Sequence, residues 1–101
     1  MAEAIISPEA LQDMGDIRSY IAMDHPEEAE RVVQAFEASA VLLATQPELG
    51  PCKPRLRGLR LWVVTEFPTY LMFYRVREGQ VEIVRVLHGA RDLKSILENH
   101  A

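Results

Sequence analysis

The chain has 101 residues, of which 49% are hydrophobic and 26% are charged, and its net charge is −4 at pH 7. This length predicts one domain spanning residues 1–101 with a single hydrophobic core. No apolar run reaches the roughly 18 residues of a membrane span, and the N-terminus lacks the basic start and long apolar region of a signal peptide. Cys52 is the only cysteine, so an internal disulfide is excluded and a reducing cytoplasm with no membrane contact is expected.

The two halves of the chain differ in charge. Residues 1–50 hold two basic and ten acidic residues, whereas residues 51–101 hold nine basic and five acidic ones. Four cations follow one another without an intervening acid: Lys53, Arg55, Arg57 and Arg60. This leaves two interpretations open, a basic surface for a negatively charged partner and an ordinary solvated loop. Direct nucleic-acid binding is not expected, because proteins that bind it are usually basic and the pI here is about 5.3.

Residues 3–6 form a weak strand candidate, and a strong helix start follows them. Ser7 is suited to cap a helix that has Pro8 at its first position. Apolar residues then recur at helical spacing, which predicts one buried face. These residues are Ala10, Met14, Ile17 and Ile21, with Leu11 and Tyr20 widening the stripe. Gly15 lies inside this helix, where glycine costs about 1 kcal/mol relative to alanine, so we expect it to pack closely against a neighbour.

A second helix is predicted between Asp24 and Pro47. Asp24 and Glu27 have the spacing of a capping box, and Pro26 suits the first turn. His25 is therefore assigned to the junction between the helices and not to catalysis. The apolar face of this helix comprises Ala29, Val32, Val33, Phe36, Ala40 and Leu43. Two such helices require a sheet against which they can bury their apolar faces.

Three β-prone runs follow a stiff loop over residues 50–55. The first spans residues 59–67, and the other two span residues 70–76 and 81–88. The last two flank Glu78-Gly79, a dipeptide typical of a two-residue hairpin loop.

This loop sets the register of the predicted hairpin. It pairs Arg77 with Gln80, and hence Arg75 with Glu82, whose opposite charges support the register. One face of the hairpin then carries Met72, Tyr74, Ile83 and Arg85, and this is the face expected to meet the helices. The other face carries Leu71, Phe73, Val84, Val86 and His88, with Arg91 at its edge. Because both faces are largely apolar, we expect the hairpin to be covered at least in part on both sides. The predicted fold is α+β with the order β-α-α-β-β-β, an N-terminal helical hairpin packed on an antiparallel-rich sheet, and a C-terminal helix from about Asp92 to Asn99.

Four segments in one order carry a resemblance to a known family. They are FYRVREGQVEIVRVLHGARDL at residues 73–93, SPEA at residues 7–10, DMGDIRSYI at residues 13–21 and QPELG at residues 46–50. Together they resemble the ParE/RelE superfamily of bacterial toxins from type II toxin–antitoxin systems, and specifically its ParE branch. The resemblance implies the same fold, growth arrest through inhibition of DNA gyrase in the bacterial cytoplasm, and neutralisation by a cognate ParD-like antitoxin.

Two alternatives are a protein with the toxin fold but no surviving toxicity and, as the runner-up, a RelE-like, ribosome-dependent mRNA endoribonuclease. Cleaving RNA at its own 2′-hydroxyl requires a general base, cations for the phosphate and an acid for the leaving oxygen. The available candidates are His88 and Arg91, and Arg91 matches a position where ribonuclease relatives keep a functional arginine. The arginine that those relatives carry in the middle strand falls on Leu71 here, and no tyrosine follows Arg91. These departures favour a toxin that is not an enzyme, with no catalytic residue.

The sequence therefore predicts an interaction surface and a structural ion pair. An apolar groove on the sheet face is expected to dock the antitoxin or the target; its predicted residues are Arg60, Leu71, Phe73, Val86, His88 and Arg91. Arg85 faces the helices, where a buried arginine needs a partner, and Asp13 or Asp16 can supply the carboxylate. The three histidines lack ligand spacing and Cys52 has no partner, so neither a metal nor another cofactor is expected.

Overall fold

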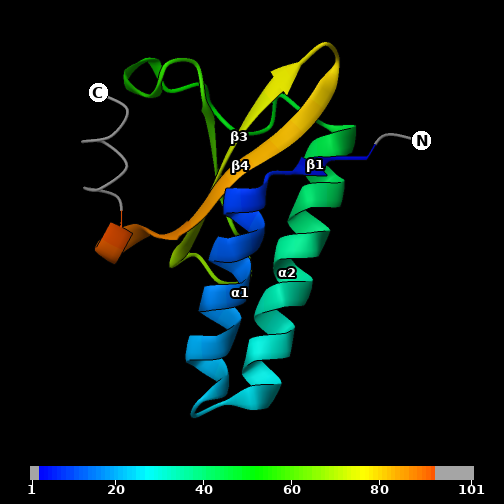
Figure 1. Cartoon of the computed structure of the whole chain (residues 1–101). Coiled ribbons are helices and arrows are strands. Elements are labelled where there is room, and N and C mark those ends of the chain that lie inside the picture. Colours follow the sequence, from blue (N-terminus) through cyan, green and yellow to red (C-terminus); the bar gives the residue numbers. More distant parts are fainter. Residues whose placement is uncertain (1–2, 93–101) are drawn as a thin grey trace.

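The computed structural model describes residues 3–92 as two helices packed on a four-stranded sheet (Figure 1). The elements are β1 Ile5–Ile6, α1 Pro8–Ala22, α2 Pro26–Thr45, a 3-10 turn Pro54–Leu56, β2 Arg60–Val63, β3 Tyr70–Arg77 and β4 Gln80–His88. The sheet order is β1-β4-β3-β2, with β1 parallel to β4 and the other neighbours antiparallel. The predicted α+β fold is confirmed. Residues 89–92 are helical, and the rest of the helix predicted to reach Asn99 lies outside the described residues.

The two helices begin in different ways. The Ser7 hydroxyl accepts a hydrogen bond from the Ala10 N–H at 3.0 Å and donates one to the Val84 carbonyl at 2.8 Å, so this cap also ties α1 to β4. Helix α2 instead starts after His25, whose side chain makes no capping bond. The capping box predicted at Asp24 is therefore wrong, because the chain enters α2 one residue later, directly before Pro26.

The hairpin turn between β3 and β4 has the predicted register. Arg77 pairs with Gln80, and Glu78 and Gly79 have φ angles of 54° and 77°. Two consecutive positive φ angles define the type I′ turn, whose twist matches that of the flanking strands. Farther along the ladder, the Arg75 Nε lies 2.7 Å from the Glu82 Oε1.

A β-bulge in β4 changes the faces beyond this point. Tyr74 pairs with Ile83 but Phe73 pairs with Arg85, so Val84 is an extra residue on β4. Side chains normally alternate across a strand, but the extra residue breaks this alternation, so that Arg85, which meets Asp13 of α1, and Val86 both lie toward the helices. Val86 therefore lies on the helix side of the sheet, where it is 1% exposed. The prediction that Val86 lies in an open groove is wrong, because the uniform register from which it was drawn does not continue past Val84.

Each face of the sheet carries its own core. The helix-side core joins both helices to the sheet and contains, among its fully buried residues, Val32, Phe36, Leu43, Met72, Tyr74, Ile83 and Val86. The loop-side core lies on the opposite face and consists of Leu56, Leu59, Phe73 and Leu87, with Leu61, Leu71 and Val84 packed against it. Leu56 and Leu59, which precede β2, thus cover the face that the sequence predicts to be an open groove.

Helix α1 buries a narrower stripe than its sequence predicts. Ala10 and Ile17 are buried, but Leu11 is 56% exposed and Tyr20 is 69% exposed. Gly15 is also exposed, and a Cβ placed on it would have no atom from another element within 4 Å. The predicted close packing at Gly15 is wrong, since α2 passes on the other side of the helix.

Candidate functional site

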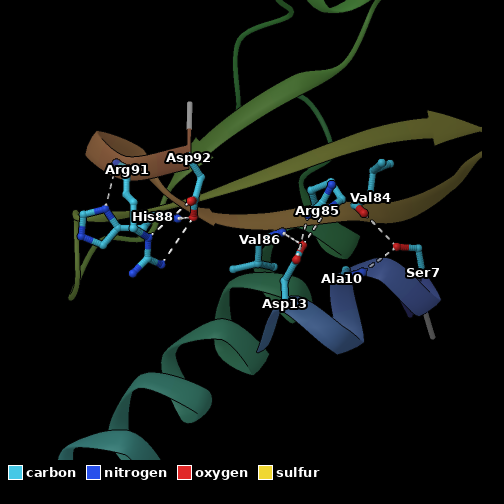
Figure 2. A network of polar contacts seen from close by, with 9 residues as sticks. All are labelled: Ser7, Ala10, Asp13, Val84, Arg85, Val86, His88, Arg91 and Asp92. Carbon is cyan, nitrogen blue, oxygen red and sulfur yellow. Dashed lines mark hydrogen bonds and ion pairs between the residues drawn. The ribbon is translucent and has the colours of Figure 1, made fainter. Parts of the chain in front are cut away.

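A hydrogen-bonded group at the middle of β4 joins α1 to the bulge (Figure 2). The Arg85 Nε lies 2.7 Å from the Asp13 Oδ2, and its terminal nitrogen lies 2.9 Å from the Oδ1. The Val86 N–H also donates to the Asp13 Oδ2, at 3.0 Å. Asp13, and not Asp16, is thus the acid of α1 that Arg85 meets. The carboxylate satisfies both a guanidinium and a backbone N–H displaced by the bulge.

The environment of Arg85 favours its charged form and a structural role. Its hydrogen bonds with Asp13 raise the pKa of Arg85 against the opposing effect of partial burial. The Arg85 side chain is 32% exposed and that of Asp13 is 12% exposed. A bidentate pair with one shielded partner fixes the position of β4 against α1.

A second polar group lies at the end of β4, at the left of Figure 2. The His88 N–H donates to the Asp92 Oδ2 at 3.0 Å, and the Arg91 N–H donates to the His88 Nδ1 at 3.2 Å. The Arg91 guanidinium reaches back to Asp92, with its Nε 3.3 Å from the Oδ1. These bonds turn the chain out of the sheet, so His88 and Arg91 share one small framework.

The two aromatic neighbours of this group come from elsewhere in the chain. The Arg91 guanidinium lies 5.9 Å above the ring of Tyr20 on α1, and the His88 ring meets that of Tyr70 edge-on at 5.7 Å. Burial raises the pKa of Tyr70, although nearby Arg91 counteracts part of this effect. Tyr70 therefore stays neutral at physiological pH and contributes a hydroxyl, not a charge.

The charge of Arg91 is largely balanced within the protein. Partial burial disfavours ionised Asp92, but hydrogen bonds from the Arg91 side chain and the His88 N–H outweigh it and hold the pKa of Asp92 below its usual value. Asp92 is therefore a carboxylate at neutral pH. A hollow of about 340 Å³ beside Arg91 is lined by a further acid, Asp16. A guanidinium that is paired with Asp92, in a hollow that Asp16 also lines, makes a poor site for the phosphates of RNA.

The six residues predicted to form the interaction surface do not form one surface. His88 and Arg91 lie together at the end of β4, whereas Arg60 lies at the start of β2, where it donates to the Gly50 carbonyl at 2.7 Å. Phe73 is completely buried in the loop-side core, and only part of Leu71 reaches the surface there. The open apolar groove predicted around Phe73 is wrong, because Leu56 and Leu59 cover it.

Sequence reasoning missed Asp92, Tyr20 and Tyr70 as neighbours of His88 and Arg91. Asp92 follows Arg91 directly in the sequence, and this adjacency was the available signal. Tyr20 follows Asp13 by two helical turns, so both side chains lie on the same face of α1. Tyr70 became the partner of His88 only because the bulge changed the register from Thr69 to Tyr70.

Metal chemistry and membrane insertion find no support within residues 3–92. No group of three or more His, Cys, Asp and Glu side chains in this part of the chain gathers closely enough to hold a metal ion. Neither of the helices in the same range combines the length and the apolar character that crossing a bilayer requires.

Comparison with known sequences identifies relatives that share nearly the whole chain. Residues 4–93 match the family described as the ParE toxin of the type II toxin–antitoxin system parDE. Toxin RelE2 of Caulobacter vibrioides is 36% identical over 91 residues, which cover 90% of this chain and 99% of that protein. The protein Y4kP of Sinorhizobium fredii is 33% identical over 89 residues, 87% of this chain and 88% of that one.

A solved structure shares the arrangement of helices and strands. It is a chain of a chromosomal ParDE toxin–antitoxin system from P. aeruginosa, with a TM-score of 0.75 and 20% sequence identity. The match covers 87% of this chain and 96% of that one. At this identity, the comparison concerns the fold.

Proposed function

The chain belongs to the ParE toxin family of type II toxin–antitoxin systems, and from this premise we propose that it inhibits DNA gyrase without cleaving nucleic acid and that a ParD-like antitoxin neutralises it. The proposal rests chiefly on the match over residues 4–93, which includes both helices and the whole sheet. Membership of the family makes this chain a toxin of a type II toxin–antitoxin system. The target and the type of antitoxin are the parts that require an experiment.

The chemistry near His88 supports a mechanism without catalysis. An RNA-cleaving site needs uncompensated cations for the phosphate in addition to an acid and a base. Arg91 is already paired with Asp92, and Leu71 occupies the place where ribonuclease relatives carry an arginine. A leucine side chain offers neither a charge nor a hydrogen bond to a substrate, and Leu71 packs against the loop-side core. Inhibition by binding requires only a complementary surface.

Inducing the protein in bacteria tests this proposal. We expect growth arrest with altered plasmid supercoiling and intact transcripts, and inhibition of purified gyrase in a supercoiling assay. His88→Ala should lose activity at most partly, because binding energy is shared among several contacts. The product of the small open reading frame beside the gene should restore growth. Normal supercoiling during full growth arrest would refute gyrase as the target.

A ribonuclease is the second candidate, because a relative bears the name RelE2 and because His88 and Arg91 are hydrogen-bonded neighbours. If this candidate is correct, ribosome-bound mRNA is cleaved on induction. His88→Ala should then lower cleavage by about a hundredfold or more, as expected for loss of a general acid or base. Gln34→Ala, a substitution of an exposed residue of α2, is a control that should not alter cleavage.

A further inference from the structure

The outer edge of β3 is uncovered at its C-terminal end. The Val64 N–H donates to the Tyr70 carbonyl, and the Gly89 N–H donates to the Thr69 carbonyl. The backbone groups of even-numbered residues of β3 therefore point toward β2, and those of odd-numbered residues point toward β4. The irregularity of this ladder is an extra residue in β4, so the alternation continues along β3. The N–H and C=O of Val76 consequently point toward the β2 side.

Strand β2 does not extend far enough to meet Val76. Its first residue, Arg60, pairs with Tyr74, and a continued ladder would bring Gly58 opposite Val76. Arg57 and Gly58 instead have φ angles of 54° and 84°. Successive left-handed residues end an extended strand, and the chain turns away into the loop. Within residues 3–92, no strand lies beside Val76 at this edge of the sheet.

A hollow of about 730 Å³ occupies this place. Val76, which is 43% exposed, and Leu49, which is 41% exposed, supply apolar surface to its walls. The segment that carries Leu49 is held there by Tyr74, whose hydroxyl donates to the Pro47 carbonyl at 2.7 Å and accepts from the Gly50 N–H at 2.9 Å. The apolar wall is therefore rigidly placed on the helix side of the sheet.

Cations surround the same edge. Arg75 and Arg77 flank Val76 in sequence, so their side chains leave the strand on the opposite face of the sheet. Arg60 and Arg75 both contribute to the lining of the hollow. Arg75 contacts Glu82 through its Nε, and Arg60 contacts the Gly50 carbonyl through one terminal nitrogen. Each guanidinium carries five N–H donors, so both retain donors for a further acceptor.

We propose that this edge binds an extended segment of the antitoxin with the pattern acid–apolar–acid. The central residue pairs with the backbone of Val76 and packs its apolar side chain against Val76 and Leu49. The residues on either side of it project to the other face, where their carboxylates meet Arg75 and Arg77. This inference rests on the proposed function, since it takes the occupant to be the antitoxin.

The walls of the hollow favour a peptide over nucleic acid. Leu49 and Val76 offer aliphatic contacts, and none of the residues lining the hollow is an aromatic side chain on which a base could stack. Glu48 also lines it, close to where a phosphate backbone would run. An extended peptide can form backbone hydrogen bonds with the N–H and C=O of Val76, whereas a nucleic acid has no peptide backbone that could extend the sheet in this way.

Amide hydrogen exchange read by NMR tests the edge pairing directly. The probe is the product of the small open reading frame next to the toxin gene. In the toxin alone, the Val76 amide should exchange rapidly while those of Arg75 and Arg77 are protected by β4. In the complex, exchange at Val76 should slow by about tenfold or more. A 20-nucleotide single-stranded RNA serves as the competing ligand, and the same slowing with RNA alone would overturn the assignment to a peptide.

Binding measurements with charge variants test the recognition pattern. Arg75→Gln combined with Arg77→Gln should weaken antitoxin binding by about tenfold, because two carboxylates lose their partners. The matched control, Arg18→Gln with Arg31→Gln on the helices, removes the same charge and should change binding less than about twofold. A neutralising complex with unchanged Val76 exchange and unaffected Gln variants would overturn this inference alone. If no complex forms with the wild type, both this inference and the antitoxin part of the proposed function fail.

Discussion

The two faces of the sheet are covered in different ways. The helix-side core is closed by α1 and α2, whose side chains interdigitate with those of β3 and β4. On the loop side, residues 54–59 cover the sheet, and Leu56 and Leu59 of this segment pack onto Phe73 and Leu87. A helix satisfies its own backbone hydrogen bonds, whereas this loop depends on a few contacts such as Lys53 N–H to the Leu59 carbonyl at 2.9 Å. The loop-covered face should therefore open at a lower free energy than the helix-covered face.

This difference has a functional consequence. In Figure 1 the helices run together along one side of the sheet, while the green loop passes over its other side. The edge position at Val76 exists because that loop ends β2 early. The edge that we propose as the site for a partner strand thus lies beside the cover that we expect to open more easily, and the helices pack against the strands on the other face.

Removal of one buried aromatic ring from each face should have the largest effect. Phe36→Ala on α2 and Phe73→Ala on β3 both truncate fully buried side chains, and each should lower the free energy of unfolding by about 3–5 kcal/mol. We expect the smaller loss for Phe73→Ala, because the loop can collapse into the vacated space more readily than two packed helices can. Urea unfolding followed by circular dichroism measures both values.

Val63→Ala provides the control for this pair. Val63 is 45% exposed at the sheet edge, so its truncation should cost less than about 1 kcal/mol. A loss for Phe73→Ala clearly above that for Phe36→Ala would contradict the comparison, since it would show that the loop-side core is the less adaptable one.

The residues of the hairpin turn and the helical spacing of apolar residues were enough to predict the face of the sheet that the helices cover. Glu78-Gly79 defined the hairpin register, and the stripe with Val32, Phe36 and Leu43 predicted the helix-covered face. These signals are local, because each depends on residues within a turn or two of one another.

The bulge and the loop-covered face depend on contacts between residues that are distant in the sequence. The bulge at Val84 is stabilised by Asp13, which lies 73 residues before Val86 in the chain and accepts its N–H. The sequence of β4 alone contains no pattern that predicts this bulge. Leu56 and Leu59 lie in a charged, proline-containing loop without periodicity, so their burial had no sequence signature. For this reason the predicted groove around Phe73 was wrong, and the predicted interaction residues are dispersed.

Substitution of Asp13 tests what holds the register of the helix-covered face. Asp13→Ala leaves the Arg85 guanidinium and the Val86 N–H without their acceptor. A fully buried pair would cost about 3–5 kcal/mol when one partner is removed. Because the Arg85 side chain is a third exposed and gains water, we expect a loss of about 2–3 kcal/mol in the free energy of unfolding.

Three further variants separate the charge of Asp13 from its role at the bulge. Asp13→Asn keeps one oxygen that can accept the Val86 N–H, so it should lose less than Asp13→Ala. Arg85→Met removes the cation and retains an apolar side chain of similar length, and it should be milder than Arg85→Ala. If all four variants matched the wild type in urea midpoint, the ion pair would have no part in positioning β4.

Substitution of glycine by alanine should change the free energy of unfolding in opposite directions at Gly15 in α1 and at Gly58 in the loop. Gly15 is exposed within α1 with no neighbouring element within 4 Å, so Gly15→Ala should stabilise the protein by about 0.5–1 kcal/mol through helix propensity. Gly58 has a φ of 84° in the loop and also has open space around it. Since an L-residue is strained at that angle, Gly58→Ala should destabilise the protein by about 1–2 kcal/mol. Neither change removes a side-chain contact, so the unfolding midpoints should move apart while the denaturant m-value stays constant. Movement of both midpoints in one direction would mean that the backbone conformation of one cover is not the one described.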